Sequence, residues 1–310
     1  MRQAPSLDQD MYAHANSSIL SDNPPFRQEH GMARKRVNQP LSIPHRRRRP
    51  VNGEPAPAWP SFTGTAEMLG ASATGVTVYV DTSLSEDGLQ NARDLLAGAD
   101  DAVRQNNAIF GIDGGPVQVI VYALGGATDG TGGADHGGCD FHVGGAIEVD
   151  ASYGNSERVI ALFEAELSEC AMNGNLCGLS TGEALSRWCA MVVGKNSLAD
   201  FASAPQWFKD GMPNWVDKTA DTDREEDSTG CGMAFLSWLG SQGHGLATIA
   251  QAMVKLEEEA VQANATATLA GLYAQLTGNA ANGAWQAFKD AIDALPGGVT
   301  SDDPFGALAA

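Results

Sequence analysis

The 310-residue sequence has no run of about 18 apolar residues, so it predicts no transmembrane helix. Its N-terminus, MRQAPSLDQDMYAHANSS, also lacks the apolar segment of a secretory signal. The arginine run at 46–49 is followed by PVNGEPAPAWP, again without an apolar segment. These absences argue against secretion by the standard route. The location stays unknown, with the cytoplasm as the default expectation.

Cysteine is scarce and odd in number, with five residues at positions 139, 170, 177, 189 and 231. This count excludes the dense, even pattern of a small disulfide-stabilised scaffold. Two interpretations remain for the closest pair in the sequence. Cys170 and Cys177 could form a disulfide across a short loop, or they could be free and buried, which is the default for such thiols.

Basic residues are few outside the N-terminal segment. Residues 1–60 carry nine Lys or Arg against five Asp or Glu, whereas the remaining 250 residues carry ten against thirty-three. A body this acidic repels polyanions, which excludes nucleic acid and anionic membranes as expected partners of the folded part. The run Arg46–Arg49 permits weak polyanion binding by the tail, although a solvated flexible segment is the favoured interpretation.

The sequence divides into two parts. Residues 1–60 are rich in Pro, Asn, Gln, Ser and Arg without apolar periodicity, which predicts a disordered basic tail, and residues 61–310 form one folded domain. Alternating and β-branched residues predict strands at 75–81 and 116–124, and CDFHV (139–143) with AIEVDA (146–151) predict a hairpin. Helical periodicity covers 88–111, 156–173, 180–194, 204–217, 228–242, 245–260, 264–277 and 282–294. We therefore expect an α+β fold: a small mixed sheet with a hairpin, followed by a mainly helical half.

The helix expected at 156–173 carries glutamates on its apolar side. Val159, Leu162 and Phe163 share one stripe by helical spacing; Glu166 falls inside this stripe, and Glu169 lies about one turn further on. A buried carboxylate is costly unless it is paired or bound to a metal, so this placement predicts a partner. Alternatively, the helix is rotated and both carboxylates reach solvent at the edge of the stripe.

The order strand, long helix, strand, hairpin and helix bearing AELSE resembles the gluzincin (thermolysin-like) metallopeptidases, whose zinc helix carries HExxH. In this resemblance Glu166 matches the glutamate that activates water, while Ala165 and Glu169 replace the two histidines. The segment PQWFKDGMPNWVDK (205–218) is similar to the helix that supplies the third zinc ligand, and it places Asp210 at that ligand. Pro213 departs from the family, since proline breaks or kinks a helix. The match spans residues 75–245.

The resemblance implies a gluzincin-like fold with a degenerate site. Ala165 offers no donor, and catalytic zinc requires nitrogen or sulfur ligands, so no zinc site of the family type and no cofactor are expected. The chain is then an inactive metallopeptidase-like protein, or pseudoenzyme, that binds an unknown peptide or protein. Two alternatives stay open. Glu166, Glu169 and Asp210 could hold a hard cation such as Ca²⁺, Mg²⁺ or Mn²⁺ in a rebuilt hydrolase site with Glu166 as base. The glutamates could also be structural, with the function in the basic tail or in an interface.

The segment STGEALSRW (180–188) has two interpretations. Ser180 and Glu183 have the spacing of a capping box, and Glu183 and Arg187 have that of an i, i+4 ion pair, which accounts for all three residues locally. In the functional interpretation, Glu183 joins the acidic set and Arg187 turns into the acidic cavity to neutralise Glu166 and Glu169.

The segment HGGCDFH places His136, Cys139 and His142 at the spacing H-x₂-C-x₂-H. Structural zinc requires four ligands and no second pair follows. If residues 139–143 form a strand, Cys139 and His142 point to opposite faces. We therefore expect a hairpin in which these residues do not form a metal site.

Overall fold

The computed structural model describes residues 58–114, 116–123, 133–136, 146–151, 155–172 and 176–309. The predicted tail up to residue 57, the arginine run and the predicted strand at 139–143 lie outside this part of the chain. The described strands are β1 (Ala66–Ala71), β2 (Val76–Asp81), β3 (Val117–Tyr122), β4 (Ala134–His136) and β5 (Ala146–Asp150). The helices are α1 (Glu86–Phe110), α2 (Ser156–Ala171), α3 (Ser180–Val193), α4 (Ala204–Lys209), α5 (Glu226–Ser241), α6 (Leu246–Gln262), α7 (Leu269–Thr277) and α8 (Ala284–Asp293), with short 3₁₀ turns at Ala199–Phe201, Ala281–Gly283 and Ala307–Ala309.

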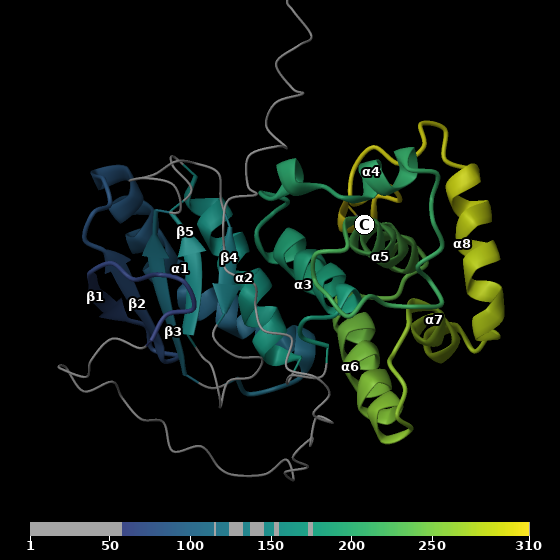
Figure 1. The fold of residues 1–310 in the computed structure, drawn as a ribbon, viewed down its shortest axis with the longest axis horizontal. Coiled ribbons are helices and arrows are strands. Elements are labelled where there is room, and N and C mark those ends of the chain that lie inside the picture. Colours follow the sequence, from purple (N-terminus) through teal and green to yellow (C-terminus); the bar gives the residue numbers. More distant parts are fainter. Residues whose placement is uncertain are drawn as a thin grey trace, which may run out of the picture. The chain divides into compact units, whose positions relative to one another are not determined.

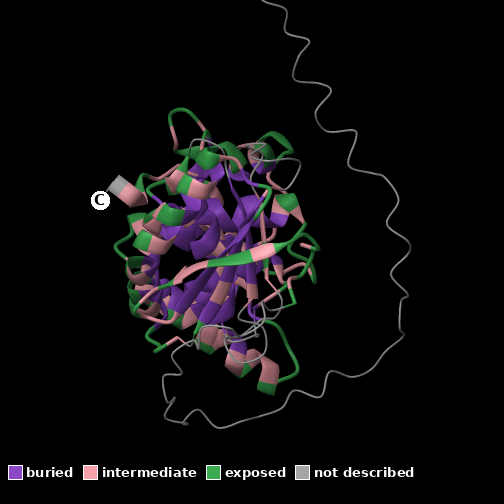
Figure 2. Cartoon of the chain, turned by 90° about the vertical axis from the view of Figure 1, so that its left-hand side faces the viewer, coloured by how far each residue is buried: buried purple, intermediate pink, exposed green. Residues whose placement is uncertain are grey.

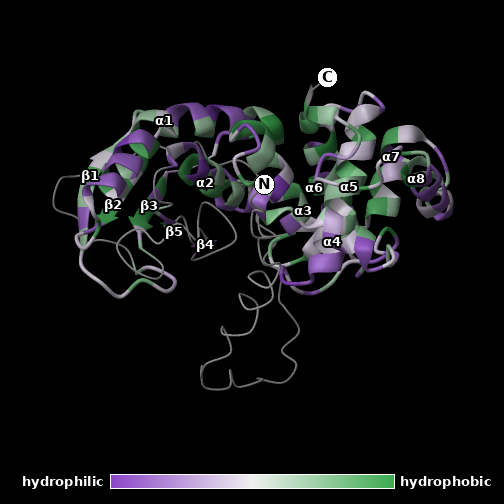
Figure 3. Ribbon diagram, turned by 90° about the horizontal axis from the view of Figure 1, so that it is seen from above, coloured by the Kyte–Doolittle hydropathy of each residue, from purple (hydrophilic) through white to green (hydrophobic). Residues whose placement is uncertain are grey.

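The α+β class is confirmed. The strands form one mixed sheet in the order β1-β2-β3-β5-β4, in which β2, β3 and β5 are parallel and both outer strands are antiparallel to their neighbours. Helices α1 and α2 contact each other and pack on the sheet (Figure 1). Viewed from above, the two helices lie on the same side of the strands (Figure 3). Helix α3 then contacts both α2 and α5, which links the sheet half to the helical half.

Two strands differ from the prediction. β1 was not predicted, because AEMLGA has no β-branched residue and half of its side chains are exposed, as an edge position permits. β4 was not predicted either: within the described chain, β5 pairs with Ala134–His136, while the predicted strand at 139–143 lies outside the described residues. This pairing matters for the site, because it places His136 on a strand.

The predicted helix at 204–217 is wrong beyond its first turns. α4 ends at Lys209, and Gly211 and Met212 follow with positive φ values of 88° and 57°, a conformation that cannot continue a helix. Pro213 comes next and has no N–H for a helical hydrogen bond. The other predicted helices are confirmed, with ends that differ by at most five residues.

The apolar residues form two main cores. One lies between the sheet and α1 and α2, and the other joins the later helices around a cluster of aromatic rings. The cartoon coloured by burial shows buried residues through the interior and exposed ones at the periphery (Figure 2). A small third cluster, with Tyr79 and Tyr122, lies on the other sheet face, where Trp59 and Phe62 contact these rings edge to face. None of the helices in the described part of the chain is long and apolar enough to span a membrane.

Candidate functional site

Helix α2 presents two glutamates inward, as its sequence predicts. Val159, Phe163 and Leu167 are fully buried against the sheet. Glu169 shares this inner side with 7% exposure, and the side chain of Glu166 is 14% exposed. The alternative, in which both carboxylates reach solvent, is therefore wrong. A carboxylate that leaves water requires a compensating partner, and the structure supplies one from a different element.

The partner is His136, which closes strand β4. In the antiparallel pair of β4 and β5, His136 lies opposite Ile147, and directly opposed residues point to the same face of a sheet. Ile147 is fully buried in the core beneath α2, so the imidazole also points toward α2. Its Nε2 lies 2.9 Å from Glu169 Oε2 and 3.9 Å from Glu166 Oε2. One imidazole thus faces both carboxylates.

Helix α3 forms the opposite wall. Arg187 Nε donates to Glu183 Oε1 at 2.5 Å, which confirms the predicted i, i+4 pair. Arg187 lines the same cavity as Glu166, as the functional interpretation expected. However, no ion pair joins Arg187 to Glu166 or Glu169 among the residues that the structure describes; its carboxylate partner is Glu183. Glu183 also hydrogen-bonds with Glu169, and Ser186 Oγ donates to Glu169 Oε1 at 3.4 Å.

The predicted capping box at Ser180 is wrong. Ser180 is the first residue of α3, after Leu179 at the cap position, and the first-turn N–H of Thr181 donates to Thr219 Oγ1 at 3.3 Å and not to Ser180. The Ser180 hydroxyl instead lies 2.6 Å from Ser228 Oγ on α5 and 3.1 Å from Thr219 Oγ1. A buried hydroxyl needs a hydrogen-bond partner. Ser180 finds its partners in these residues, which are distant in the sequence, and not in the backbone N–H groups of its own helix.

The three carboxyl groups differ in their ionisation. Burial, followed by the charge of Glu169, raises the pKa of Glu166 well above its usual range. Burial acts on Glu169 in the same direction, but the hydrogen bond and charge of His136 outweigh it and lower the pKa of Glu169. Burial also raises the pKa of Glu183 to about 7, against the opposing effect of Arg187. The site therefore combines one ionised carboxylate with neighbours that hold protons more readily.

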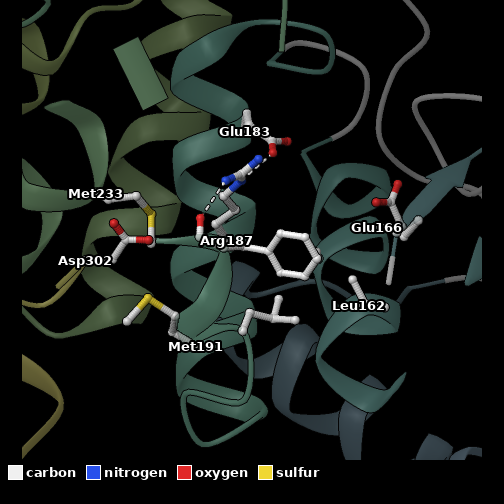
Figure 4. A pocket seen from close by; sticks show the side chains of 12 residues that line it. Leu162, Glu166, Glu183, Arg187, Met191, Met233 and Asp302 are labelled. Carbon is white, nitrogen blue, oxygen red and sulfur yellow. Dashed lines mark hydrogen bonds and ion pairs between the residues drawn. The ribbon is translucent and has the colours of Figure 1, made fainter. Parts of the chain in front are cut away.

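A cavity of about 240 Å³ opens beside these residues, between α2 and α3. Glu166 and Leu162 project from α2 on one side, and Glu183 and Arg187 from α3 on the other (Figure 4). The remaining lining is Gly133, Ala134, Ala165, Met191, Leu198, Phe201, Met233 and Asp302. The lining thus combines a few charged side chains with apolar ones, as is common in sites for small ligands or side chains.

Asp210 does not belong to the site. It directly follows the short helix α4, where its carboxylate is exposed and accepts from Gln206 Nε2 at 2.9 Å. The assignment of Asp210 as a third ligand assumed a helix that continues to residue 217, but the helix ends before Gly211 and Pro213. Glu183 occupies the cavity wall instead.

Cys177 lies close to the imidazole, with its Sγ 3.8 Å from His136 Nε2. His136, Glu169 and Cys177 each place one potential ligand atom within 4.8 Å of the others. However, Cys177 is disulfide-bonded, so it has no thiolate to offer a metal. Cys170 is buried and forms no disulfide, so the alternative in which Cys170 pairs with Cys177 is wrong, and the default of a buried thiol holds for Cys170 but not for Cys177. Cys139 and His142 lie outside the described residues.

The zinc site implied by the gluzincin resemblance does not fit these residues. The methyl group of Ala165 lines the cavity at the position of the first histidine, and Glu169 stands at the second. Two of the nitrogen donors of the family are thus absent at their own positions. The comparisons add no family: no protein-family model, curated protein or solved structure matches the chain.

His136 was not predicted as a site residue. The sequence pattern around it suggested only a weak metal motif with Cys139 and His142, whereas its carboxylate neighbours Glu166 and Glu169 lie on α2, and Glu169 is 33 residues further along the chain. The alternation in AIEVD indicated a strand that could pair with a preceding strand. That pairing would have shown to which sheet face His136 points only if its register had been known.

Proposed function

We propose that this chain is a metallopeptidase-like binding protein, inactive as a zinc peptidase, that receives a peptide or similar ligand in the cavity between α2 and α3. The observation that carries the proposal is the replacement at Ala165: the cavity persists, but its wall has a methyl group where the resemblance places a zinc ligand. Fold alone does not determine activity once the site has changed.

The cavity lining supports a binding role. Leu162, Met191 and Met233 offer apolar contact, and flexible methionine side chains adapt to ligands of different shape. Glu166 and Asp302 add carboxylate groups to the lining, and Asp302 Oδ1 is held in place by Ser203 N at 3.0 Å and Ala204 N at 2.7 Å. Phe201 also lines the cavity and is 37% exposed, and Arg158 Cζ lies 4.4 Å from the centroid of its ring, a cation–π contact that helps to hold the ring in place.

The test fills the cavity. Ala165→Trp is expected to abolish binding of tripeptides from an acetyl-Ala-X-Ala series, measured by saturation-transfer NMR, because the indole occupies the ligand volume. Val192→Trp is the matched control, since Val192 is exposed at 38% and lies outside the cavity lining. The proposal fails if no tripeptide binds the parent, if Ala165→Trp binds as the parent does, or if the parent cleaves peptides in a chelator-sensitive reaction.

A second candidate is a hydrolase with a rebuilt carboxylate site. It is favoured by the convergence of Glu166, Glu169 and Glu183, with His136 Nε2 3.9 Å from Glu166 Oε2. Glu166 would then act as general base on a water in the cavity, as the resemblance implies for this position. A panel of fluorogenic peptides and esters tests this candidate. Turnover that Glu166→Gln abolishes, with tripeptide binding retained, would favour the hydrolase over the binding protein.

A further inference from the structure

We propose that His136, Glu169 and Glu166 bind one divalent first-row transition metal ion. This inference goes beyond the binding function proposed above and does not depend on it. The donors come from two elements, β4 and α2, and converge at the edge of the cavity. The only histidine among them lies on β4, whereas the gluzincins carry their two histidines on the helix that α2 resembles. Ala165 takes no part.

The geometry brings the donors near one point. His136 Nε2 is 2.9 Å from Glu169 Oε2 and 3.9 Å from Glu166 Oε2. Atoms that share a metal at about 2.0–2.2 Å lie roughly 3–4 Å apart, so these separations need only small side-chain movements to admit an ion. Glu166 and Glu169 are three residues apart on α2 and therefore occupy neighbouring positions on one helix face.

A second layer of contacts orients the donors. Glu183 and Ser186 hydrogen-bond with Glu169, and Arg187 holds Glu183 from the far side. The strand pairing of His136 with Ile147 fixes the imidazole side of the site. Hydrogen-bonded carboxylates of this kind set the orientation of metal ligands and raise metal affinity.

The donor set selects the class of ion. One imidazole nitrogen with carboxylate oxygens suits Mn²⁺, Fe²⁺, Co²⁺ or Zn²⁺, whereas Ca²⁺ takes six to eight oxygen ligands. Cys177 adds no thiolate, because it is disulfide-bonded. Glu166 lines the cavity, so coordination positions not taken by protein atoms face the ligand volume. The ion would therefore be reachable by a carboxylate or carbonyl group of a bound molecule.

Isothermal titration of the full chain with Mn²⁺, Zn²⁺ and Ca²⁺, each without any organic ligand, tests the site. We expect saturable binding of one Zn²⁺ or Mn²⁺ per chain, and weaker binding of Ca²⁺. His136→Ala is expected to weaken Zn²⁺ binding by more than about 100-fold, beyond the loss seen when only an outer-shell partner is removed. Glu169→Gln is expected to act in the same direction. Co²⁺ substitution adds a direct readout, since its visible absorption reports nitrogen ligation.

Two control variants test whether Zn²⁺ binds at this site and not at exposed histidine or carboxylate side chains elsewhere on the surface. His244→Ala removes a partly exposed histidine before α6, and Glu157→Gln removes an exposed carboxylate in the first turn of α2, so both should bind Zn²⁺ as the parent does. Circular dichroism and thermal unfolding establish that His136→Ala and Glu169→Gln are folded. If either does not fold, the Co²⁺ spectrum of the parent decides alone, and a spectrum of oxygen ligands only overturns the proposal.

The proposal is also overturned if no ion binds with a stoichiometry of one, or if His136→Ala binds Zn²⁺ as tightly as His244→Ala. These outcomes are independent of the tripeptide experiment, because the titration contains the metal alone. A chain that binds tripeptides but no metal would contradict only the metal site, and the reverse result would contradict only the binding function.

Discussion

His136 Nε2 and Glu169 Oε2 lie 2.9 Å apart and join the edge strand β4 to helix α2. β4 has only three residues and pairs with β5 along one side, so this contact is a substantial part of what holds its end against the helix. The same contact lowers the pKa of Glu169 and brings Glu166 within 3.9 Å of the imidazole. The register of β4 on β5 thus determines that the imidazole of His136 faces the two carboxylates.

Restoring the histidines tests the gluzincin resemblance. In a His136→Ala background, which removes the imidazole from β4, the double substitution Ala165→His and Glu169→His recreates the HExxH pattern on α2. We expect this protein to retain one zinc ion per chain through dialysis, because two imidazoles one helical turn apart would face the cavity with Glu183 opposite. Elemental analysis by mass spectrometry measures the zinc, with His136→Ala alone as the reference.

The third ligand of the restored site distinguishes Glu183 from Asp210. Glu183→Gln in the restored background should release the zinc, since Glu183 lines the cavity. Asp210→Asn should leave the zinc content unchanged, because Asp210 is exposed and bonded to Gln206. Loss of zinc in Asp210→Asn but not in Glu183→Gln would contradict the assignment made from the structure and support the one made from the sequence.

The sequence was sufficient for the elements with strong local periodicity. The apolar stripe of α2 correctly predicted that Glu166 and Glu169 point inward. The spacing of Glu183 and Arg187 correctly predicted their ion pair. Both predictions depend on helix geometry alone. The wrong predictions depended on non-local or backbone effects. Asp210 lies outside the site because the helix ends before Gly211, which has a positive φ. Ser180 hydrogen-bonds with Ser228, 48 positions away, and does not cap its helix.

Glu148 anchors the segment before β1 to the sheet. This fully buried carboxylate accepts from Ser61 N at 2.9 Å, Ser61 Oγ at 2.5 Å and Phe62 N at 2.7 Å. Glu148→Ala leaves these donors without an acceptor and is expected to reduce the free energy of unfolding by roughly 2–4 kcal/mol, the scale of losing hydrogen bonds to a buried charged group. Urea unfolding measures the change, and Glu67→Ala on the exposed side of β1 is the control.

Release of that segment has a local readout. Trp59 contacts Tyr79, so Glu148→Ala should shift the tryptophan emission and expose the chain near residue 60 to limited proteolysis. An unfolding curve and a digestion pattern identical to those of the parent would show that the aromatic contacts hold the segment without the carboxylate.

Phe288 is the centre of the aromatic core in the helical half. Its fully buried ring contacts Trp207, Phe235 and Trp238, with centroids 5.0–5.8 Å away. Phe288→Ala is expected to cost about 3–5 kcal/mol, because it removes apolar contacts and leaves a cavity that its neighbours cannot fill. Gln286→Ala, exposed on the same helix, should change stability by less than about 0.5 kcal/mol. Equal unfolding midpoints for the two variants would contradict the assignment of this core.

Asp100 gives a pH dependence that lies apart from the site. Its carboxylate accepts from Thr74 Oγ1 at 2.7 Å, Thr74 N at 2.8 Å and Ala73 N at 3.2 Å, which ties helix α1 to the turn before β2. Hydrogen bonds from the side chains of Thr74 and Ser72, and from the Thr74 backbone, lower the pKa of Asp100 to about 2 from 3.8. Because the folded state favours the ionised form, this contribution is complete above pH 3.8 and is lost as the pH falls toward 2.

The expected contribution is at most about 1 kcal/mol, since the group is partly exposed to solvent. Asp100→Asn should therefore be less stable than the parent at pH 5 and should approach it near pH 2, as measured by urea unfolding across that range. Asp101→Asn is the matched control, because Asp101 is exposed and pairs only along the helix surface with Arg104 and Gln105. A constant difference between the parent and Asp100→Asn from pH 5 to pH 2 would show that the lost contacts, and not the ionisation of Asp100, account for the effect.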